Sequence, residues 1–301
     1  MTEPLLHVDG LRLDAPVGRG AHAILRDVSF QIMPGEAYGL VGESGSGKSV
    51  TSLAVMGLLK KPLRVTGGKI LFKGRDLLAL PKREMRRLRG NRIAMIFQEP
   101  MTALNPLSTV GRQIAEMFVL HQNKGWDEAE KLAVEALASV RVPSPDRRAR
   151  NYPHQMSGGL RQRVMIAMAL ACNPDLLIAD EPTTALDVTV QAEVLRLIQE
   201  LCAERGTAVL LISHDLGVIA SICQRVGVMY AGCLVEENET RALFSDPRHD
   251  YTRGLLGAIP RLGSRSLHGR RRLTDIDSIV GDRSKLTETR FIAPRGGEGG
   301  P

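Results

Sequence analysis

The sequence predicts an α/β fold in which a mainly parallel sheet is connected by helices. Two observations support this prediction. A glycine-rich loop joins a short apolar strand to a helix near the N-terminus, and later in the chain apolar strands alternate with amphipathic helices. Such alternation is typical of parallel sheets with crossover helices, and 301 residues suffice for a large core. The later segments are the strands Leu176–Ala179, Ala208–Ile212 and Val226–Tyr230 and the helices Val190–Glu204 and Leu216–Cys223.

The N-terminal part begins with a strand at Leu25–Ile32, where apolar and polar residues alternate as on a half-buried strand. The pair Pro34-Gly35 then marks a turn. The segments that follow are the buried strand Ala37–Val41, the helix Val50–Leu59, the strand Lys69–Phe72 and the basic amphipathic helix Lys82–Arg89.

The middle of the chain is helical. From Ser108 to about Val140, apolar residues recur at spacings of three and four, and a proline-rich break follows before a further helix at Leu160–Ala171. We interpret this block, about residues 100–172, as a helical insertion into the α/β domain. Beyond Pro260 the periodicity fades, which predicts a main domain over residues 1–260 and a partly disordered C-terminal extension over 261–301.

The positive charge is concentrated in two segments. The chain has 40 Lys+Arg and 33 Asp+Glu residues, a net charge of +7. Residues 81–92 contain six basic residues and one acidic residue, and residues 261–301 contain nine and five. The rest of the chain is close to neutral, so a broad basic surface for nucleic acid is not predicted.

The cysteine pattern favours a reducing compartment. Cys172, Cys202, Cys223 and Cys233 form no CxxC pair, and no secretory segment follows Met1, so we expect four buried free thiols in a cytoplasmic protein. The longest apolar run has nine residues, well short of the roughly 20 that a membrane helix needs. We therefore expect the chain to reach a membrane only through a partner.

The glycine-rich loop fits the P-loop pattern G-x-x-x-x-G-K-[ST]. Its glycines let successive backbone N–H groups point at a phosphate, and the following helix adds its positive end. The lysine reaches the β- and γ-phosphates and the last hydroxyl can bind Mg²⁺. On its own the motif predicts a nucleotide and no more. Its residues are Gly42, Glu43, Ser44, Gly45, Ser46, Gly47, Lys48 and Ser49.

A second acidic motif follows the buried strand at residues 176–179. Asp180 and Glu181 come directly after four apolar residues and precede Pro182. Asp180 is placed to hold Mg²⁺, directly or through water, and Glu181 to take a proton from an attacking water molecule. Together with the P-loop, the pair predicts nucleotide hydrolysis.

Residues 156–163 begin a helix with Met-Ser-Gly-Gly-Leu-Arg-Gln-Arg, which resembles the signature of the ATP-binding cassette (ABC) transporters. The side chain of Ser157 and the N–H groups of Gly158 and Gly159 form a second anion-binding helix start. In the ABC family this site binds the γ-phosphate of the nucleotide held by the other subunit. The resemblance therefore implies that two chains enclose each ATP.

Three further residues match the family in order. Gln98 resembles the glutamine that senses Mg²⁺ and faces the membrane partner, and Asp187 resembles the aspartate of the D-loop. His214 resembles the switch histidine that contacts the γ-phosphate and positions Glu181. The resemblance implies ATP and Mg²⁺ as ligands, with the metal near Ser49, Gln98 and Asp180.

The resemblance covers about residues 5–260. It implies a P-loop NTPase fold with an antiparallel β subdomain, an inserted helical subdomain and a C-terminal extension. Ile96–Pro106, Ser157–Leu170 and Ala179–Gln191 are similar to the peptide and nickel importer ATPases of the oligopeptide and dipeptide permease type.

This chain departs from the family pattern in three ways. The fifth signature residue is Leu160 instead of glutamine. Residues 17–25, upstream of the P-loop, contain no Phe, Tyr or Trp to stack on adenine, so His22 or the cationic Arg19 is the candidate. Relatives carry a cysteine-rich C-terminal segment thought to bind an iron–sulfur cluster, whereas this chain has no cysteine after Cys233. A cluster needs thiolates, so none is predicted.

We expect an ATPase, converting ATP and water to ADP and phosphate, that powers peptide import from the cytoplasmic face of the inner membrane. The implied partners are a second ATPase subunit (a related chain or a copy of itself), two membrane permeases and, indirectly, an extracytoplasmic solute-binding protein. Nickel, opines, glutathione or another small solute remains an alternative cargo. A soluble ABC ATPase acting on DNA or ribosomes is a distant alternative: the interval before the signature has no room for a long coiled coil, and the chain has one nucleotide domain.

Overall fold

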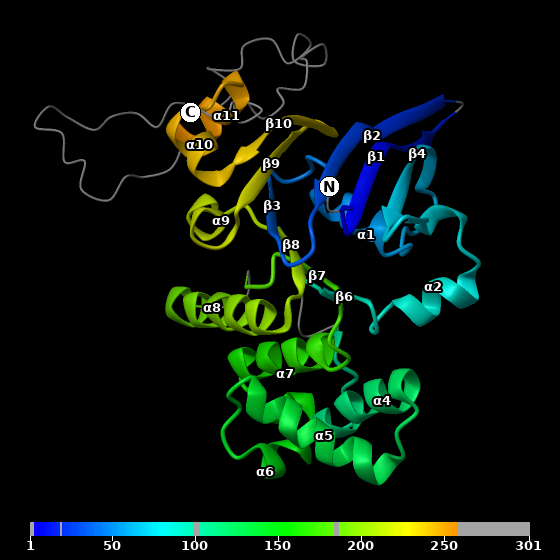
Figure 1. The fold of residues 1–301 in the computed structure, drawn as a ribbon, viewed down its shortest axis with the longest axis vertical. Coiled ribbons are helices and arrows are strands. Elements are labelled where there is room, and N and C mark those ends of the chain that lie inside the picture. Colours follow the sequence, from blue (N-terminus) through cyan, green and yellow to red (C-terminus); the bar gives the residue numbers. More distant parts are fainter. Residues whose placement is uncertain (1–2, 19, 99–102, 184–186, 258–301) are drawn as a thin grey trace, which may run out of the picture.

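The computed structural model describes residues 3–18, 20–98, 103–183 and 187–257. Within these ranges the chain forms two sheets and a group of helices at one end (Figure 1). One sheet has the strand order β10-β9-β3-β8-β7-β6 and the other β2-β1-β4-β5. The strands are β1 (Leu6–Val17), β2 (Gly20–Ile32), β3 (Ala37–Val41), β4 (Arg64–Phe72), β5 (Arg75–Asp76), β6 (Ile93–Ile96), β7 (Leu176–Asp180), β8 (Ala208–Ile212), β9 (Arg225–Tyr230) and β10 (Cys233–Glu239).

The six-stranded sheet is parallel from β9 to β6, and β10 pairs antiparallel with β9. Its strands β3, β6, β7 and β8 are apolar on both faces. In β7, Leu177 and Ala179 pack in the core shared with the helical subdomain, whereas Leu176 and Ile178 pack in the core shared with the antiparallel sheet. Burial on both faces explains the uninterrupted apolar runs of the predicted strands.

The four-stranded sheet is antiparallel, as the family resemblance implied. Its central strand β1 was not predicted. Leu6 and Val8 alternate with outward residues, but the register shifts between Val8 and Leu11, where Gly10 adopts a φ of 57°. This bulge interrupts the two-residue period and hides the strand in the sequence.

The helical subdomain consists of α4 (Val110–Gln122), α5 (Trp126–Ser139), α6 (Pro145–Ala149) and α7 (Gly158–Leu170), which lie together below the parallel sheet in Figure 1. The predicted helical stretch at 108–140 is two helices. Asn123 ends α4 in the left-handed conformation, with a φ of 54°, and turns the chain back. The predicted domain boundary at residue 260 lies outside the described residues.

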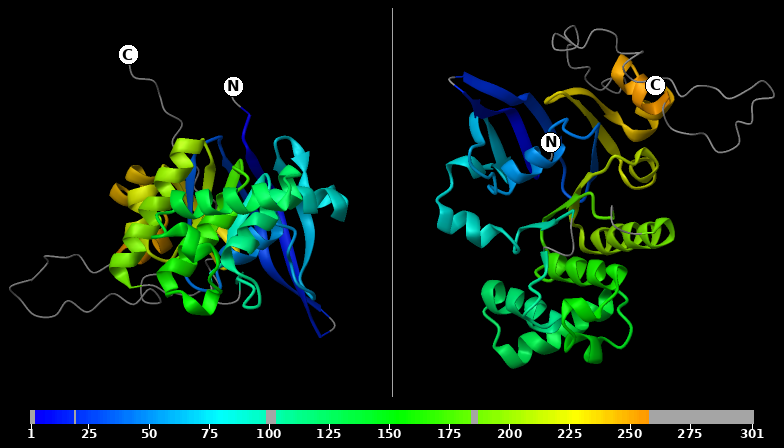
Figure 2. Two further views of the ribbon diagram at one scale, coloured as in Figure 1. Left: turned by 90° about the horizontal axis from the view of Figure 1, so that it is seen from below. Right: turned by 180° about the vertical axis from the view of Figure 1, so that it is seen from behind.

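The remaining helices are α1 (Lys48–Val55), α2 (Lys82–Leu88), α8 (Val188–Arg205), α9 (Leu216–Ile222), α10 (Thr240–Ser245) and α11 (Asp250–Gly257). The last two were not predicted, because they are short and partly polar. They lie beside β9 and β10, at the end of the molecule opposite the helical subdomain (Figure 2). No helix in the described ranges is both long and apolar enough to cross a membrane.

Candidate functional site

The P-loop lies between β3 and α1, and its glycines meet two structural demands. Gly42, Gly45 and Gly47 have φ angles of 147°, 81° and 107°, which favour glycine. A Cβ atom at Gly42 would lie 2.1 Å from the carbonyl oxygen of Met229, and one at Gly47 would lie 2.6 Å from Cδ2 of Leu25. The loop thus fits tightly against β9 and β2.

The Lys48 side chain is buried over this loop. Its Nζ donates hydrogen bonds to the carbonyl oxygens of Gly42 and Glu43, both at 2.8 Å, and lies 3.3 Å from Oγ of Ser46. Burial lowers the pKa of Lys48, and nearby carboxylates, Glu181 foremost, oppose that shift. The ammonium is therefore held within the loop, where the pattern predicts the β- and γ-phosphates.

Ser49 and Asp180 bring two oxygen ligands together. Oγ of Ser49 donates to Oδ1 of Asp180 at 3.0 Å. Burial raises the pKa of Asp180, and the hydrogen bond from Ser49 counters this. Hydroxyl and carboxylate oxygens suit Mg²⁺, which usually takes its other ligands from water and phosphate. Among the described residues no group of three or more His, Cys, Asp or Glu side chains is placed to hold a metal.

Gln98 and His214 both contact the carboxylate of Glu181. Nε2 of Gln98 donates to one carboxylate oxygen at 2.8 Å, and Nδ1 of His214 lies 3.3 Å from the other. The three residues follow β6, β7 and β8, which are neighbours in the sheet, so their side chains meet at its carboxyl edge. The Glu181 backbone has a φ of 45°, and its N–H donates to the carbonyl oxygen of Ile212 at 2.9 Å. The structure therefore assembles the residues that the sequence predicts for hydrolysis.

The signature residues are not part of this group of side chains and lie at the start of α7. Ser157 is the N-cap of α7, with Oγ accepting from the N–H of Leu160 at 3.4 Å, and Ser157 and Gly158 are exposed. A Cβ at Gly159 would meet Val190 at 3.1 Å, which places the start of α7 against α8. The helix α7 belongs to the helical subdomain, whereas α1 lies on the other side of the parallel sheet (Figure 1).

The other predicted site residues are exposed. Asp187 is the N-cap of α8 without a side-chain cap, and Ala185 and Leu186 lie outside the described residues. His22 is exposed on β2, three residues before Leu25. Its role against adenine stays a prediction. The alternative, Arg19, also lies outside the described residues.

The sequence model of the family described as "ABC transporter" matches residues 25–184. The chain belongs to this family. The family described as "Oligopeptide/dipeptide transporter, C-terminal region" matches residues 235–288, a range that includes the predicted start of the extension. The resemblance inferred from the motifs is thereby confirmed, and the chain is an ABC ATPase.

Relatives of this ABC ATPase carry transport names. It is 56% identical to a probable peptide ABC transporter ATP-binding protein of Sinorhizobium fredii, over 85% of this chain and 76% of the relative. It is 49% identical to the dipeptide transport ATP-binding protein DppD of Bacillus subtilis, over 93% and 83%, and 51% identical to the oligopeptide transport protein OppD of Salmonella typhimurium, over 86% and 77%.

A solved ABC cassette has the same fold. The dimeric cassette MJ0796, in a post-hydrolysis state bound to ADP and Pi, aligns with a TM-score of 0.70 and 28% identity, covering 78% of this chain and 99% of that one. The predicted fold class is thereby confirmed for the part of this ABC ATPase that aligns.

Sequence reasoning missed two residues that brace the P-loop of this ABC ATPase. The N–H of Gly232, in the turn between β9 and β10, donates to the carbonyl oxygen of Ser46 at 3.0 Å. The hydroxyl oxygen of Tyr251, in α11, accepts from the N–H of Glu43 at 3.0 Å. No local pattern in the sequence marks either contact.

The expectation of four buried thiols was wrong for one of them. Cys172, Cys202 and Cys223 are buried, whereas Cys233 is half-buried, and all four are free. Cys233 is the first residue of β10 and is less buried than the four residues that follow it. Burial raises the pKa of Cys202 and of Cys223 to about 12, so these thiols are unreactive.

Proposed function

We propose that this ABC ATPase powers the import of peptides, working at the cytoplasmic face of the membrane as a peripheral subunit. The peptide cargo is supported by the transport names of the relatives and by the match of residues 235–288. The proposed hydrolytic role of the site depends chiefly on one observation, the placement of the Glu181 carboxylate between Gln98 and His214.

In the proposed mechanism, the P-loop amides and Lys48 bind the phosphates. Ser49 and Asp180 would hold Mg²⁺, which when bound would supply positive charge beside the phosphate oxygens. Glu181 takes the proton of the attacking water.

A second ATPase subunit completes each site. Because Ser157 and Gly158 are exposed at the start of α7, their N–H groups and hydroxyl are free to meet the γ-phosphate bound by a facing P-loop. We propose that ATP joins two subunits in this way, and that the partner is a related chain or a copy of this one. Hydrolysis then releases the pair.

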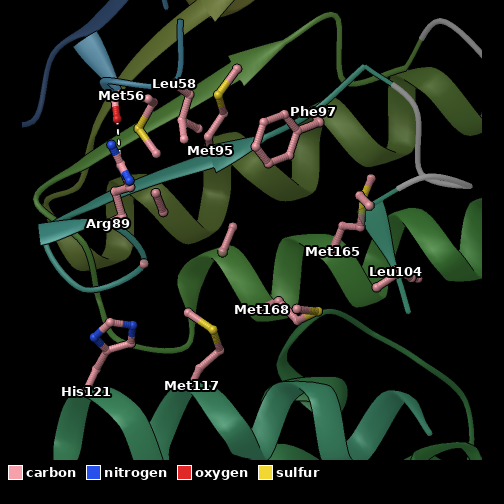
Figure 3. Close-up of a pocket in the computed structure, with 14 residues that line it drawn as sticks. Met56, Leu58, Arg89, Met95, Phe97, Leu104, Met117, His121, Met165 and Met168 are labelled. Carbon is pink, nitrogen blue, oxygen red and sulfur yellow. Dashed lines mark hydrogen bonds between the residues drawn. The ribbon is translucent and has the colours of Figure 1, made fainter. Parts of the chain in front are cut away.

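A groove beside Gln98 suits a permease helix. It is a cavity of about 330 Å³ between the parallel sheet and the helical subdomain, and its lining is mostly apolar. Figure 3 shows methionine side chains from both sides pointing into it, with Arg89 and His121 at one end. The methionines in the lining are Met56, Met95, Met117, Met165 and Met168.

Three features of the groove favour an apolar helix as its occupant. Methionine side chains are flexible and adapt to a docked surface. The Arg89 guanidinium is committed to the carbonyl oxygens of Met56 and Gly57, both at 2.7 Å, and burial lowers the pKa of His121. Phe97 lines the groove, is 40% exposed and directly precedes Gln98. A docked helix that moves Phe97 would therefore also move Gln98, which donates a hydrogen bond to Glu181.

The decisive experiment combines transport with identification of partners. In cells lacking this chain, uptake of labelled di- to pentapeptides should be lost, and it should return with the wild-type chain but not with Lys48→Ala. Nickel uptake, measured in the same cells, should not change. The tagged chain, purified from membranes, should bring permeases and a second ATPase subunit. Normal peptide uptake together with lost uptake of nickel or another solute would contradict the peptide assignment.

A further inference from the structure

The C-terminal region contacts the nucleotide-binding loop directly. Tyr251 lies in α11, within the matched C-terminal range 235–288, and its hydroxyl oxygen accepts the N–H of Glu43 at 3.0 Å. The two residues are 208 positions apart in the chain. The contact therefore connects the start of the C-terminal region to the first turn of the P-loop.

Tyr251 is held firmly enough to act as a fixed acceptor. Its side chain is fully buried, and its ring packs on that of Tyr230 with centroids 4.4 Å apart. Its own N–H donates to Nδ1 of His249 at 3.1 Å. His249 is in turn anchored through its N–H, which donates to the buried carboxylate of Glu236 at 3.0 Å. A buried, packed tyrosine loses little further freedom when it makes this bond.

The hydrogen bond fixes a peptide that also holds the P-loop lysine. The carbonyl oxygen of Glu43 accepts from Nζ of Lys48 at 2.8 Å, while the N–H of the same residue donates to Tyr251. Both polar groups of the Glu43 backbone are thus engaged within the protein. The orientation of this peptide therefore sets one of the three oxygen contacts that hold the lysine.

We propose that Tyr251 is a positioning residue for nucleotide binding: its hydroxyl sets the Glu43 peptide and, through it, Lys48. The inference rests on the proposed assignment of residues 42–49 as the nucleotide cradle. Through Tyr251, the matched C-terminal region has a direct part in nucleotide affinity.

The test compares two phenylalanine variants of the full chain. Tyr251→Phe removes the acceptor and keeps the ring. Tyr230→Phe is the matched control, because it removes the hydroxyl of the neighbouring ring, for which the described residues show no hydrogen bond. MgADP binding is measured by titration calorimetry, which requires neither dimerisation nor hydrolysis. We expect the Kd to rise about tenfold for Tyr251→Phe, because binding must then restore the Glu43 peptide to its orientation at about the cost of one hydrogen bond, and less than twofold for Tyr230→Phe.

The outcomes separate the possible failures. An unchanged Kd for Tyr251→Phe, with or without a lower Tm, would show a purely structural role and overturn the proposal, as would equal shifts in both variants. Lys48→Ala serves as the reference: if it binds MgADP normally, the P-loop assignment fails instead. Should Tyr251→Phe not fold, amide exchange of the wild-type chain decides. Glu43 should exchange more slowly than the exposed Ser44, and equally fast exchange overturns the proposal.

Discussion

Glu181 is the residue whose chemistry is most constrained by its neighbours. Replacing it with glutamine keeps the shape and the hydrogen-bonding capacity toward Gln98 but removes the base. We expect Glu181→Gln to lower ATP turnover by about 10²–10⁴-fold, the usual contribution of a general base, and to retain ATP-driven association with the partner subunit. Phosphate release and gel filtration with ATP measure the two effects. Undiminished turnover would contradict the assignment.

Gly42 and Gly45 of the P-loop differ in the space that the structure leaves for a side chain. At Gly42 a Cβ meets the Met229 carbonyl oxygen at 2.1 Å, whereas at Gly45 no atom lies within 4 Å, although both residues have positive φ. We expect Gly42→Ala to lower the free energy of unfolding by about 3 kcal/mol or more, and Gly45→Ala by only about 1 kcal/mol. Urea unfolding measures both. Equal losses would mean that the loop moves away from β9 without cost.

At the scale of elements, the start of α11 depends on a neutral histidine. Nδ1 of buried His249 accepts the N–H of Tyr251, so protonation there breaks the bond. Burial lowers the pKa of His249; Glu236 and Asp250 oppose this shift, whereas Arg253 adds to it. The unfolded chain, with a pKa near 6.5, takes up the proton more readily than the folded chain. The contribution of this hydrogen bond to the stability of the fold is therefore complete above about pH 6.5 and is lost as the pH falls below that value.

The expected result is a loss of Tm between about pH 7 and pH 5.5 that is smaller in His249→Asn. Asparagine does not titrate, and its side-chain oxygen can take the place of Nδ1 as the acceptor. His154→Asn is the control, because His154 is exposed and its replacement should leave the pH dependence as in the wild type. A pH profile of His249→Asn that matches the wild type would show that another group carries the effect.

Strands with an unbroken apolar sequence could be predicted, whereas a strand interrupted by a bulge and a very short strand could not. The core strands β3, β7, β8 and β9 read as unbroken apolar runs because both faces of their sheet are covered. The bulge near Gly10 hid β1, and β6 is only four residues long beside an arginine-rich segment.

The same contrast holds in the site. Asp180 and Glu181 were predictable because a strand ends there. Tyr251 was not, since its partner amide is distant in the chain and no local pattern marks a contact that only tertiary packing creates.

At the scale of the whole molecule, the parallel sheet separates two cores, and the two halves of the proposed nucleotide site belong to different cores. The P-loop helix α1 packs in the core shared with the antiparallel sheet, and the signature helix α7 packs in the core of the helical subdomain. The groove of Figure 3 lies where the two parts meet, beside Gln98. A shift of one part against the other would change both the groove and the signature surface that faces the partner.

This separation predicts that the signature can be disabled without harm to nucleotide binding by the same chain. Gly158→Asp places a carboxylate at the exposed start of α7, where the helix dipole favours it, so the fold should tolerate the change. The carboxylate would repel the phosphate of a nucleotide on the facing subunit. We expect the Kd of the isolated chain for MgATP to stay within about twofold, while ATP-driven association and turnover fall by at least about tenfold. Lys48→Ala should instead lose binding itself. A raised Kd in the isolated Gly158→Asp chain would mean that the signature contacts the nucleotide of its own subunit, contrary to the separation that the fold imposes.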